Sequence, residues 1–487
     1  MALAVVALML GIVAVAASPA PGADAAPTQQ LTCSWTNLGN STRELHFVAS
    51  AIDTDQNKLY VYGGVNASYA AQSQVEVADF SGATLGVSHR TVTASGSRAL
   101  VGAAGAYRAK GDSDESAVYF FGGASDPSVG QGGNVVQRYL TKAGRWEVVS
   151  PANATAFTNR LGAAAEYDPE HDVIWVVGGV TQCKLSDVIG GGQCNARSLT
   201  TVYLSFDPTT GQPTWNTLAG GAQSVYAHSM VYDSAGKRML IFGGTNTIQS
   251  GQSTLLALDL SDPDPDKASF STLATTGRAP SVLFHGAAYD PVQNWMIVAG
   301  GATNNFLTNR EATENNTHAL DLGQTPPAWV SLTSYRDRVA GAMAYVPNHG
   351  VAVFTLGRNK VTNPESPRID RRTDALVCGA APPPTTPPPV EPTTPAPTQP
   401  GPGPTAPPQP TPVPAPEECA FVANKVPGQA RADALANPAS VYGYQMLCNP
   451  NLPPSPFNTM RNRLSMQNAA KPYHPMYNGL VWSCGCP

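Results

Sequence analysis

The feature that most constrains the fold of this chain is a short pattern that recurs along it: an apolar run followed at once by two glycines. Five intact copies end in the pairs Gly63-Gly64, Gly122-Gly123, Gly178-Gly179, Gly243-Gly244 and Gly300-Gly301. Successive pairs lie 56 to 65 residues apart, and a degenerate sixth copy covers residues 351–357. Such a period is typical of repeat architectures, in which each repeat is one supersecondary unit that packs against the next.

A strand and a turn precede the glycine pairs. In the third repeat, residues 163–168 are followed by a turn at 169–172, and in the fourth, residues 229–233 are followed by a turn at 234–237. The Asp-Pro and Ala-Gly steps at these turns indicate antiparallel hairpins. With 45 glycines and 44 prolines, which are both penalised in helices, the composition also favours β structure. We therefore expect an all-β fold with little helix.

Large aromatic residues follow several of the glycine pairs. Three repeats have two matching residues there: Tyr139 with Trp146, Phe206 with Trp215, and Leu320 with Trp329. In the fourth repeat, Phe270 stands where the Trp would be. With the five intact copies, this pattern makes residues 31–378 resemble the kelch repeats of galactose-oxidase-like proteins. The resemblance implies a six-bladed β-propeller of four-stranded sheets around a central channel. We interpret the aromatic residues as core between blades, with a sugar-stacking platform as the alternative.

The sixth repeat lacks its last strand, and the N-terminal region supplies a candidate for it. Residues 31–39 contain a Trp-x-x-Leu sequence like that of residues 215–218 in the third repeat. We therefore expect this N-terminal strand to complete the last blade and close the ring. Cys33 and Cys378 would then lie on adjacent strands, within the distance that a disulfide requires.

The eight cysteines favour disulfides in an exported chain. Cys183 and Cys194 bracket a glycine-rich insertion in the third repeat, where we expect a stapled surface loop. The tail holds the remaining four, Cys419, Cys448, Cys484 and Cys486. The last two are too close to pair with each other, so each should pair with one of the first two, in an order that stays open. Zinc is the alternative for these thiolates, but they lack a Cys-x-x-Cys pair.

The two ends of the chain differ in composition from the repeats. Residues 1–25 hold an apolar run and then small residues, as in a cleaved signal peptide, with a short membrane anchor as the alternative. Residues 379–416 are about half proline, which predicts an extended spacer. Residues 417–487 predict a small Cys-rich module of no recognisable family. We expect a secreted or cell-surface protein with no membrane span after signal cleavage.

The charge balance argues against one class of partner. A net charge of -5 leaves no basic surface that would neutralise a phosphate backbone. Nucleic acid is therefore not expected. The partner that we expect is an extracellular protein or a glycan, and the oligomeric state stays open.

Four polar residues are candidates for a ligand site at one mouth of the channel. His228 and His285 stand at the same place in the fourth and fifth repeats, and Arg160 and Arg338 share another place in the third and sixth. Equivalent places in a ring face the same mouth, where such rings bind ligands. The alternative is that these side chains form hydrogen bonds with neighbouring blades, as buried polar groups must.

The sequence supports an enzymatic function less well than a binding function. A copper radical oxidase, which the resemblance implies first, needs a Cys cross-linked to a Tyr, and every cysteine of the repeats has an expected disulfide partner. We predict no catalytic residue, metal site or cofactor. We interpret the protein as an extracellular binding or scaffold protein whose propeller presents its loops to a partner, while the tail attaches it to a surface or a second partner. The alternative is a glycan-acting oxidase, epimerase or lyase with its site at the channel mouth.

Overall fold

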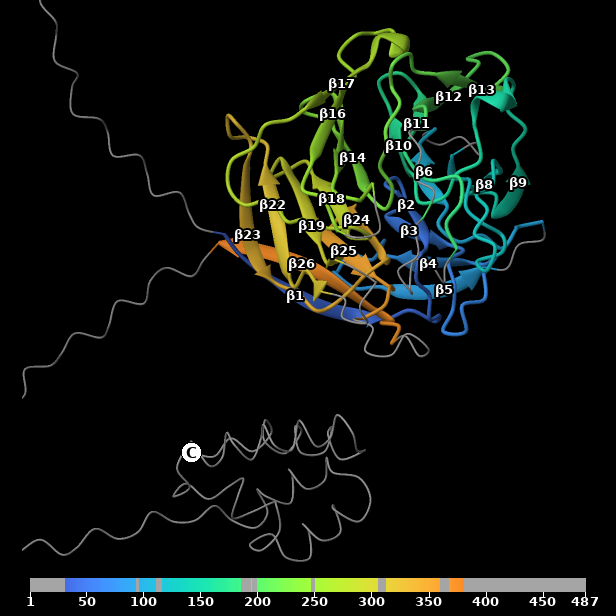
Figure 1. The fold of residues 1–487 in the computed structure, drawn as a ribbon. Helices are drawn as coiled ribbons and strands as arrows, with labels where there is room; N and C mark the ends of the chain where they lie inside the picture. Colours follow the sequence, from blue (N-terminus) through green and yellow to red (C-terminus); the bar gives the residue numbers. More distant parts are fainter. Residues whose placement is uncertain are drawn as a thin grey trace, which may run out of the picture. The chain divides into compact units, whose positions relative to one another are not determined.

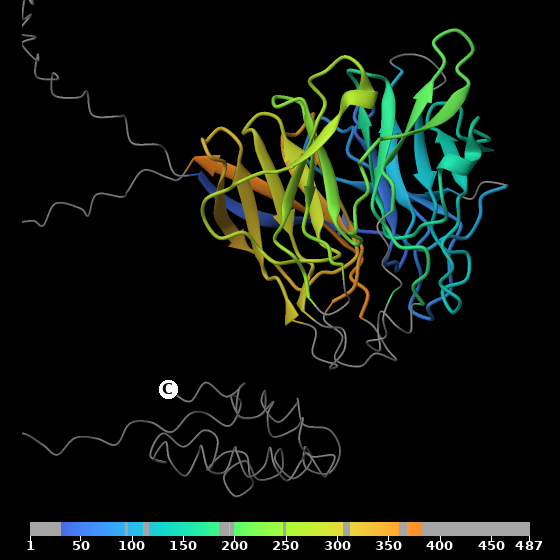
Figure 2. The same cartoon turned by 45° about the horizontal axis from the view of Figure 1, so that its top comes forward.

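The structure is a computed structural model that describes residues 31–92, 96–110, 116–184, 194, 199–246, 250–304, 312–359 and 368–380. Within these ranges the strands form six four-stranded antiparallel sheets and one small hairpin. The sheets are arranged as the blades of a propeller, as Figure 1 and Figure 2 show. The six-bladed, all-β fold expected from the sequence is therefore confirmed. No helix in the described part of the chain is long and apolar enough to cross a membrane.

Each blade runs from an inner strand at the axis to an outer strand at the rim. The first two blades contain β2 (Ala49–Asp53), β3 (Lys58–Tyr62), β4 (Val75–Asp79) and β5 (Ser88–Val92), then β6 (Ala104–Arg108), β7 (Ala117–Phe121), β8 (Val136–Leu140) and β9 (Arg145–Val148). The next two contain β10 (Ala164–Asp168), β11 (Val173–Val177), β12 (Val202–Phe206) and β13 (Pro213–Thr217), then β14 (Ser229–Asp233), β15 (Arg238–Phe242), β16 (Leu255–Asp259) and β17 (Ser269–Thr272).

The last two blades depart from this simple order. The fifth contains β18 (Gly286–Asp290), β19 (Trp295–Ala299), β22 (Asn316–Asp321) and β23 (Ala328–Ser334), with the hairpin β20 (Ala302–Asn304) and β21 (Ala312–Thr313) between its second and third strands. The sixth contains β24 (Ala342–Val346), β25 (Val351–Thr355), β26 (Arg372–Ala380) and β1 (Leu31–Asn40). Two short 3-10 helices, η1 (Ala154–Ala156) and η2 (Pro265–Lys267), lie in connections.

The hydrophobic core lies between neighbouring blades. The second strand of each blade, which is the apolar run of the sequence repeat, is almost entirely buried, because a neighbouring blade covers each face of the sheet. Trp215 is 1% exposed, and its ring stacks on that of Phe157 with centroids 4.5 Å apart. The ring of Trp146 packs at 4.9 Å from that of Tyr62 in the preceding blade. Both tryptophans thus belong to the core.

The glycine pairs allow neighbouring blades to approach closely. In the first blade, Gly63 and Gly64 have φ angles of 66° and 74°, a region that side chains disfavour. A Cβ atom on Gly63 would lie 2.3 Å from the carbonyl oxygen of Leu100, just before the second blade. Only glycine fits this position, which explains why the pair recurs with the blades.

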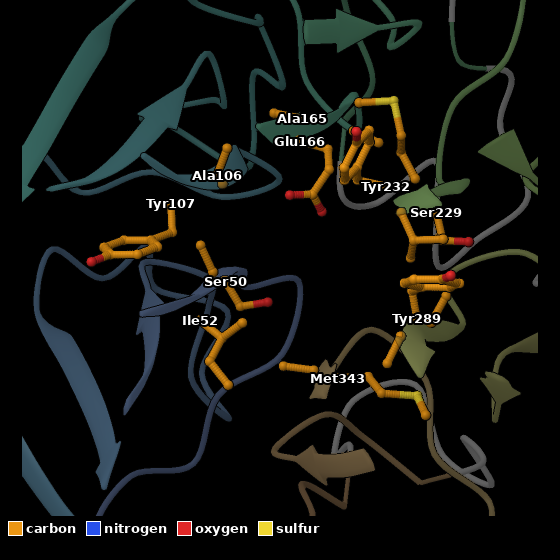
Figure 3. Close-up of a pocket in the computed structure, with 18 of the residues that line it drawn as sticks. Ser50, Ile52, Ala106, Tyr107, Ala165, Glu166, Ser229, Tyr232, Tyr289 and Met343 are labelled. Atoms are coloured by element: carbon orange, nitrogen blue, oxygen red, sulfur yellow. The ribbon is translucent and has the colours of Figure 1, made fainter. Parts of the chain in front are cut away.

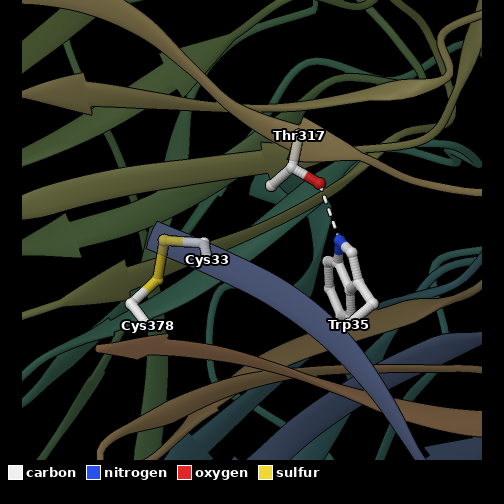
Figure 4. The surroundings of a disulfide bond; sticks show 4 residues. All are labelled: Cys33, Trp35, Thr317 and Cys378. Atoms are coloured by element: carbon white, nitrogen blue, oxygen red, sulfur yellow. Dashed lines mark hydrogen bonds between the residues drawn. A yellow bond between two sulfur atoms is a disulfide. The ribbon is translucent and has the colours of Figure 1, made fainter. Parts of the chain in front are cut away.

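The N-terminal strand closes the ring at the rim. Strand β1 pairs antiparallel with β26, with Cys33 directly opposite Cys378, and the two cysteines form a disulfide (Figure 4). On the same strand, Trp35 Nε1 donates a 2.7 Å hydrogen bond to Thr317 Oγ1 of the fifth blade. The sixth blade is thus made from both ends of the described chain and is also tied to its neighbour.

Several expectations concern residues that the structure does not describe. The signal segment at 1–25, the spacer after residue 380 and the Cys-rich module at 417–487 lie outside the described residues. Strand β26 continues to Ala380, two residues beyond the propeller end expected from the sequence. The second disulfide expected within the repeats, Cys183–Cys194, is present.

Candidate functional site

A cavity of about 510 Å³ occupies the axis of the propeller. Its walls are the inner strands of all six blades, β2, β6, β10, β14, β18 and β24 (Figure 3). Each blade lines it from the residue before the inner strand to the first residue of the following turn. In the fourth blade these limits are His228 and Ser234.

A ring of main-chain hydrogen bonds narrows one end of this channel. It joins the residues two places before the inner strands, Phe47, Gly102, Gly162, Ala227, Phe284 and Ala340. The N–H of each residue donates to the carbonyl oxygen of its equivalent in the preceding blade, at 2.7 to 3.1 Å, and the sixth bond returns to the first blade. All six residues have positive φ angles. With a spacing of about 4.8 Å between neighbours, the ring radius is about 5 Å, which leaves room for little more than a water molecule.

Apolar side chains cover the same end. The rings of Phe47 and Phe284 meet edge to face with centroids 5.1 Å apart. Phe47, Ala227 and Ala340 are each 7% exposed, whereas Gly102, Gly162 and Phe284 are partly exposed and border a second, apolar cavity. Because the hydrogen-bonded ring leaves room for little more than a water molecule, a ligand has to enter the cavity from the opposite end, where the turns after the inner strands lie.

Tyrosines surround the cavity near this open end. The fourth residue of five inner strands is Tyr107, Tyr167, Tyr232, Tyr289 or Tyr345, and the sixth strand has Ile52 there. Several hydroxyls are held by the turns: Tyr107 donates to Asp55 Oδ2 at 3.0 Å, Tyr167 to Asp172 Oδ1 at 2.9 Å and Tyr289 to Asn294 Oδ1 at 3.0 Å. Burial raises the pKa of each of these five tyrosines, so the phenols are neutral at pH 7.

Glu166 is the one acidic residue among those that line the cavity. It is the third residue of β10, and its side chain points into the cavity, as Figure 3 shows. Glu166 Oε1 accepts a 3.0 Å hydrogen bond from the N–H of Tyr167. Burial raises the pKa of Glu166 to about 7. Near neutral pH the cavity therefore contains a carboxyl group that readily gains or loses a proton.

Two of the four residues selected from the sequence line the cavity together. His228 and His285 lie at its narrow end and are 8% and 9% exposed. His285 Nε2 is 2.8 Å from Ser229 Oγ, whereas neither ring nitrogen of His228 has a hydrogen-bond partner among the described residues. Burial lowers the pKa of His228 to about 4 and that of His285 to about 3, so both rings are neutral at pH 7.

The two arginines selected with them lie elsewhere. Arg160 and Arg338 are fully buried and are not among the cavity's lining residues. Arg160 Nη1 donates to the carbonyl oxygen of Thr200 at 3.2 Å. Arg338 Nη2 lies 3.0 Å from Asp370 Oδ2 and 3.2 Å from Asp374 Oδ2. These contacts hold parts of a blade to the loops beside it.

Sequence analysis missed the tyrosines and Glu166, although both leave a signal. Once the repeats are aligned on their inner strands, a tyrosine recurs at the fourth place. At the third place Glu166 interrupts a set of small or apolar residues, Ala51, Ala106, Val231, Ala288 and Ala344. No group of three or more His, Cys, Asp or Glu residues in the described part of the chain has the arrangement of a metal site.

Comparison with known proteins supports the fold. No protein-family model matches the chain, and no curated protein matches it. A solved structure titled "Structure of YjhT" superposes with a TM-score of 0.51 at 15% sequence identity, covering 70% of this chain and 99% of that one. A likeness at this level of identity bears on the fold alone. Membership of residues 31–378 in the kelch family stays a prediction.

Proposed function

We propose that this chain is an exported binding protein whose propeller takes a small polar molecule, or the end of a glycan, into its central cavity. The observation that carries the proposal is the 510 Å³ cavity with a narrow, covered end and a tyrosine-lined open end. Its volume is that of typical small-ligand sites, and a few polar groups in apolar walls are their usual lining. The disulfide Cys33–Cys378 supports an oxidising, extracellular setting.

A sugar suits these walls better than a purely apolar molecule. Aromatic rings pack against the C–H faces of a sugar, and the hydroxyls of Ser50 and Ser229 offer hydrogen bonds to its hydroxyl groups. A protein loop is a poorer occupant, because the cavity is small and is reached from one end. The tail would then attach the propeller to a surface or to a second partner.

A second candidate is a glycan-acting enzyme with its site in the same cavity. It is favoured by Glu166, because a general acid or base works best when its pKa lies near the working pH. Turnover separates the two candidates: an enzyme would convert a bound glycan into a product that nuclear magnetic resonance detects, and a binding protein would leave it unchanged.

A cavity-filling variant tests where the ligand binds. Ser50→Met places in the first blade the residue that the fourth and sixth blades carry at the equivalent place, Met230 and Met343. The fold should therefore tolerate the change. We expect a glycan array probed with the full chain to show binding that weakens at least tenfold in Ser50→Met. Val148→Met, at a 56% exposed place on β9, is the matched control and should bind like the wild type. Equal binding by all three proteins would exclude the cavity.

A further inference from the structure

We infer that the central cavity selects ligands that carry an ammonium group, and that the side chain of Glu166 holds this group. The inference rests on the proposed function, because it names the chemistry of the ligand in that same cavity. It starts from one carboxyl group that points into a cavity with no lysine or arginine in its lining.

The fold itself does not require a glutamate at this place. Its five equivalents are four alanines and one valine, so a methyl group or a small apolar side chain satisfies the packing. Glu166 is partly buried, and the burial of a carboxyl group costs stability unless a cation or several hydrogen bonds compensate it. The hydrogen bond that Glu166 Oε1 accepts comes from the N–H of Tyr167, the next residue in its own strand. The structure thus carries a cost at Glu166 that a ligand is suited to offset.

The other titratable groups in the cavity do not supply the missing positive charge. Five of the six inner strands each contribute a tyrosine, two histidines lie just before β14 and β18, and β2 contributes no titratable group. These residues are Tyr107, Tyr167, Tyr232, Tyr289, Tyr345, His228 and His285. Burial keeps the histidines and the tyrosines neutral at pH 7. Neither lysine nor arginine is among the lining residues. The lining therefore supplies no counterion for an ionised Glu166, and a cationic ligand can supply one.

An ammonium group meets two favourable partners here. A hydrogen bond between an ammonium and a carboxylate is roughly twice as strong as one between neutral groups, and more so away from water. Tyr232, on the neighbouring inner strand β14, brings an aromatic ring to the same cavity. Aromatic faces attract cations. An anionic ligand would instead be repelled by Glu166, and a neutral one would gain a hydrogen bond only.

Binding should be linked to the protonation of Glu166. In the empty cavity the carboxyl group is about half protonated at pH 7, whereas an ammonium ligand requires the carboxylate. Such a ligand therefore displaces a proton from the fraction that is protonated. The affinity for a ligand that keeps its positive charge should rise about fivefold from pH 6 to pH 7, because the ionised fraction of Glu166 rises about fivefold over this range. A neutral ligand should show no such rise.

Calorimetric titration of the full chain tests the inference with three probes: glucosamine, glucose and tetramethylammonium. Glucosamine differs from glucose by an ammonium group in place of one hydroxyl. We expect the wild type to bind glucosamine at least tenfold more tightly than glucose, and more tightly at pH 7 than at pH 6, a range over which the amine of glucosamine stays mostly protonated. Glu166→Gln keeps the shape of the side chain and should abolish both differences. Glu147→Gln, on the outer strand β9, is the matched control and should keep them.

The outcomes separate the ligand sources and the two proposals. Binding of glucosamine without tetramethylammonium would support an amino sugar, and binding of both would support the ammonium group as such. No binding of either cation, or glucosamine binding that is unchanged in Glu166→Gln, would overturn the inference. If the wild type binds glucosamine and glucose equally, and both are lost in Ser50→Met, the ammonium inference is wrong and the cavity remains the binding site. The pH dependence in the wild type tests the inference even if Glu166→Gln fails to fold.

Discussion

The main-chain N–H of Phe47 donates a 2.9 Å hydrogen bond to the carbonyl oxygen of Ala340, and this contact joins the first blade to the sixth at the axis. It completes the cycle of six equivalent hydrogen bonds around the channel. At the rim the same two ends of the ring are joined differently, through the pairing of β1 with β26 and the disulfide Cys33–Cys378. The propeller is thus closed twice, by main-chain hydrogen bonds inside and by a covalent bond outside.

The disulfide at the rim should contribute strongly to stability. It links residues 345 positions apart, so it restricts the unfolded chain far more than it restricts the folded one. In the chain-entropy model a loop of this length corresponds to about 6 kcal/mol. We expect the double variant Cys33→Ser/Cys378→Ser to lose stability of this order in urea unfolding followed by tryptophan fluorescence. A loss below about 1 kcal/mol would mean that strand pairing alone closes the ring.

The fold could be predicted because its physical requirements recur in every blade. A positive φ angle and close blade contact demand glycine at places such as Gly63, and a strand covered on both faces demands an apolar run. The same residue types therefore recur at equivalent positions of each repeat. The pairing of Cys33 with Cys378 could be expected too, because the sixth repeat lacks its last strand and the N-terminal segment can supply it.

The candidate site was harder to predict, because it departs from the repeat. Arg160 and Arg338 occupy equivalent places, but the side chain of Arg160 forms a buried hydrogen bond and that of Arg338 a buried ion pair. Sequence position alone does not reveal these contacts. Glu166 matters because its equivalents lack a charge, so a search for recurring polar residues passes over it. Equivalence in the repeat locates a residue along a blade, but it leaves the direction of a long side chain open.

Aspartates at the ends of inner strands should stabilise the turns that follow. Asp53, Asp168, Asp233 and Asp290 occupy this place in four blades. Asp290 Oδ1 accepts hydrogen bonds from the N–H groups of Val292 at 2.9 Å and Gln293 at 3.1 Å. Because Asp290 is 7% exposed, Asp290→Ala should cost about 1 to 3 kcal/mol in urea unfolding. Asp290→Asn retains an acceptor oxygen and should cost less; an equal loss would point to charge in place of hydrogen bonding.

A buried carboxylate near the seam between the first and last blades should make stability depend on acidic pH. Burial by itself would raise the pKa of Glu76, but hydrogen bonds from His89, Thr42 and Ser41 outweigh it and lower the pKa to about 2. A depressed pKa adds stability that is present above the unfolded value near 4.5 and is lost as the pH falls towards 2. We expect the unfolding free energy of the wild type to fall by roughly 3 kcal/mol over this interval. In Glu76→Gln this part of the pH dependence should be absent, and its persistence would assign it to other carboxylates.

Glu166 should have the opposite effect on stability. Its pKa is raised by burial to about 7, above the unfolded value near 4.5. Between these values the folded state holds a proton that the unfolded state has released, so the stability is fully present below pH 4.5 and falls as the pH rises to about 7. The loss should be at most about 3 kcal/mol. Thermal unfolding monitored by circular dichroism should therefore show Glu166→Gln to be more stable than the wild type at pH 8, with the difference disappearing near pH 4.5. A variant less stable at pH 8 would mean that the empty cavity already offers Glu166 a stabilising partner, which would remove the reason for the ligand to bring a cation.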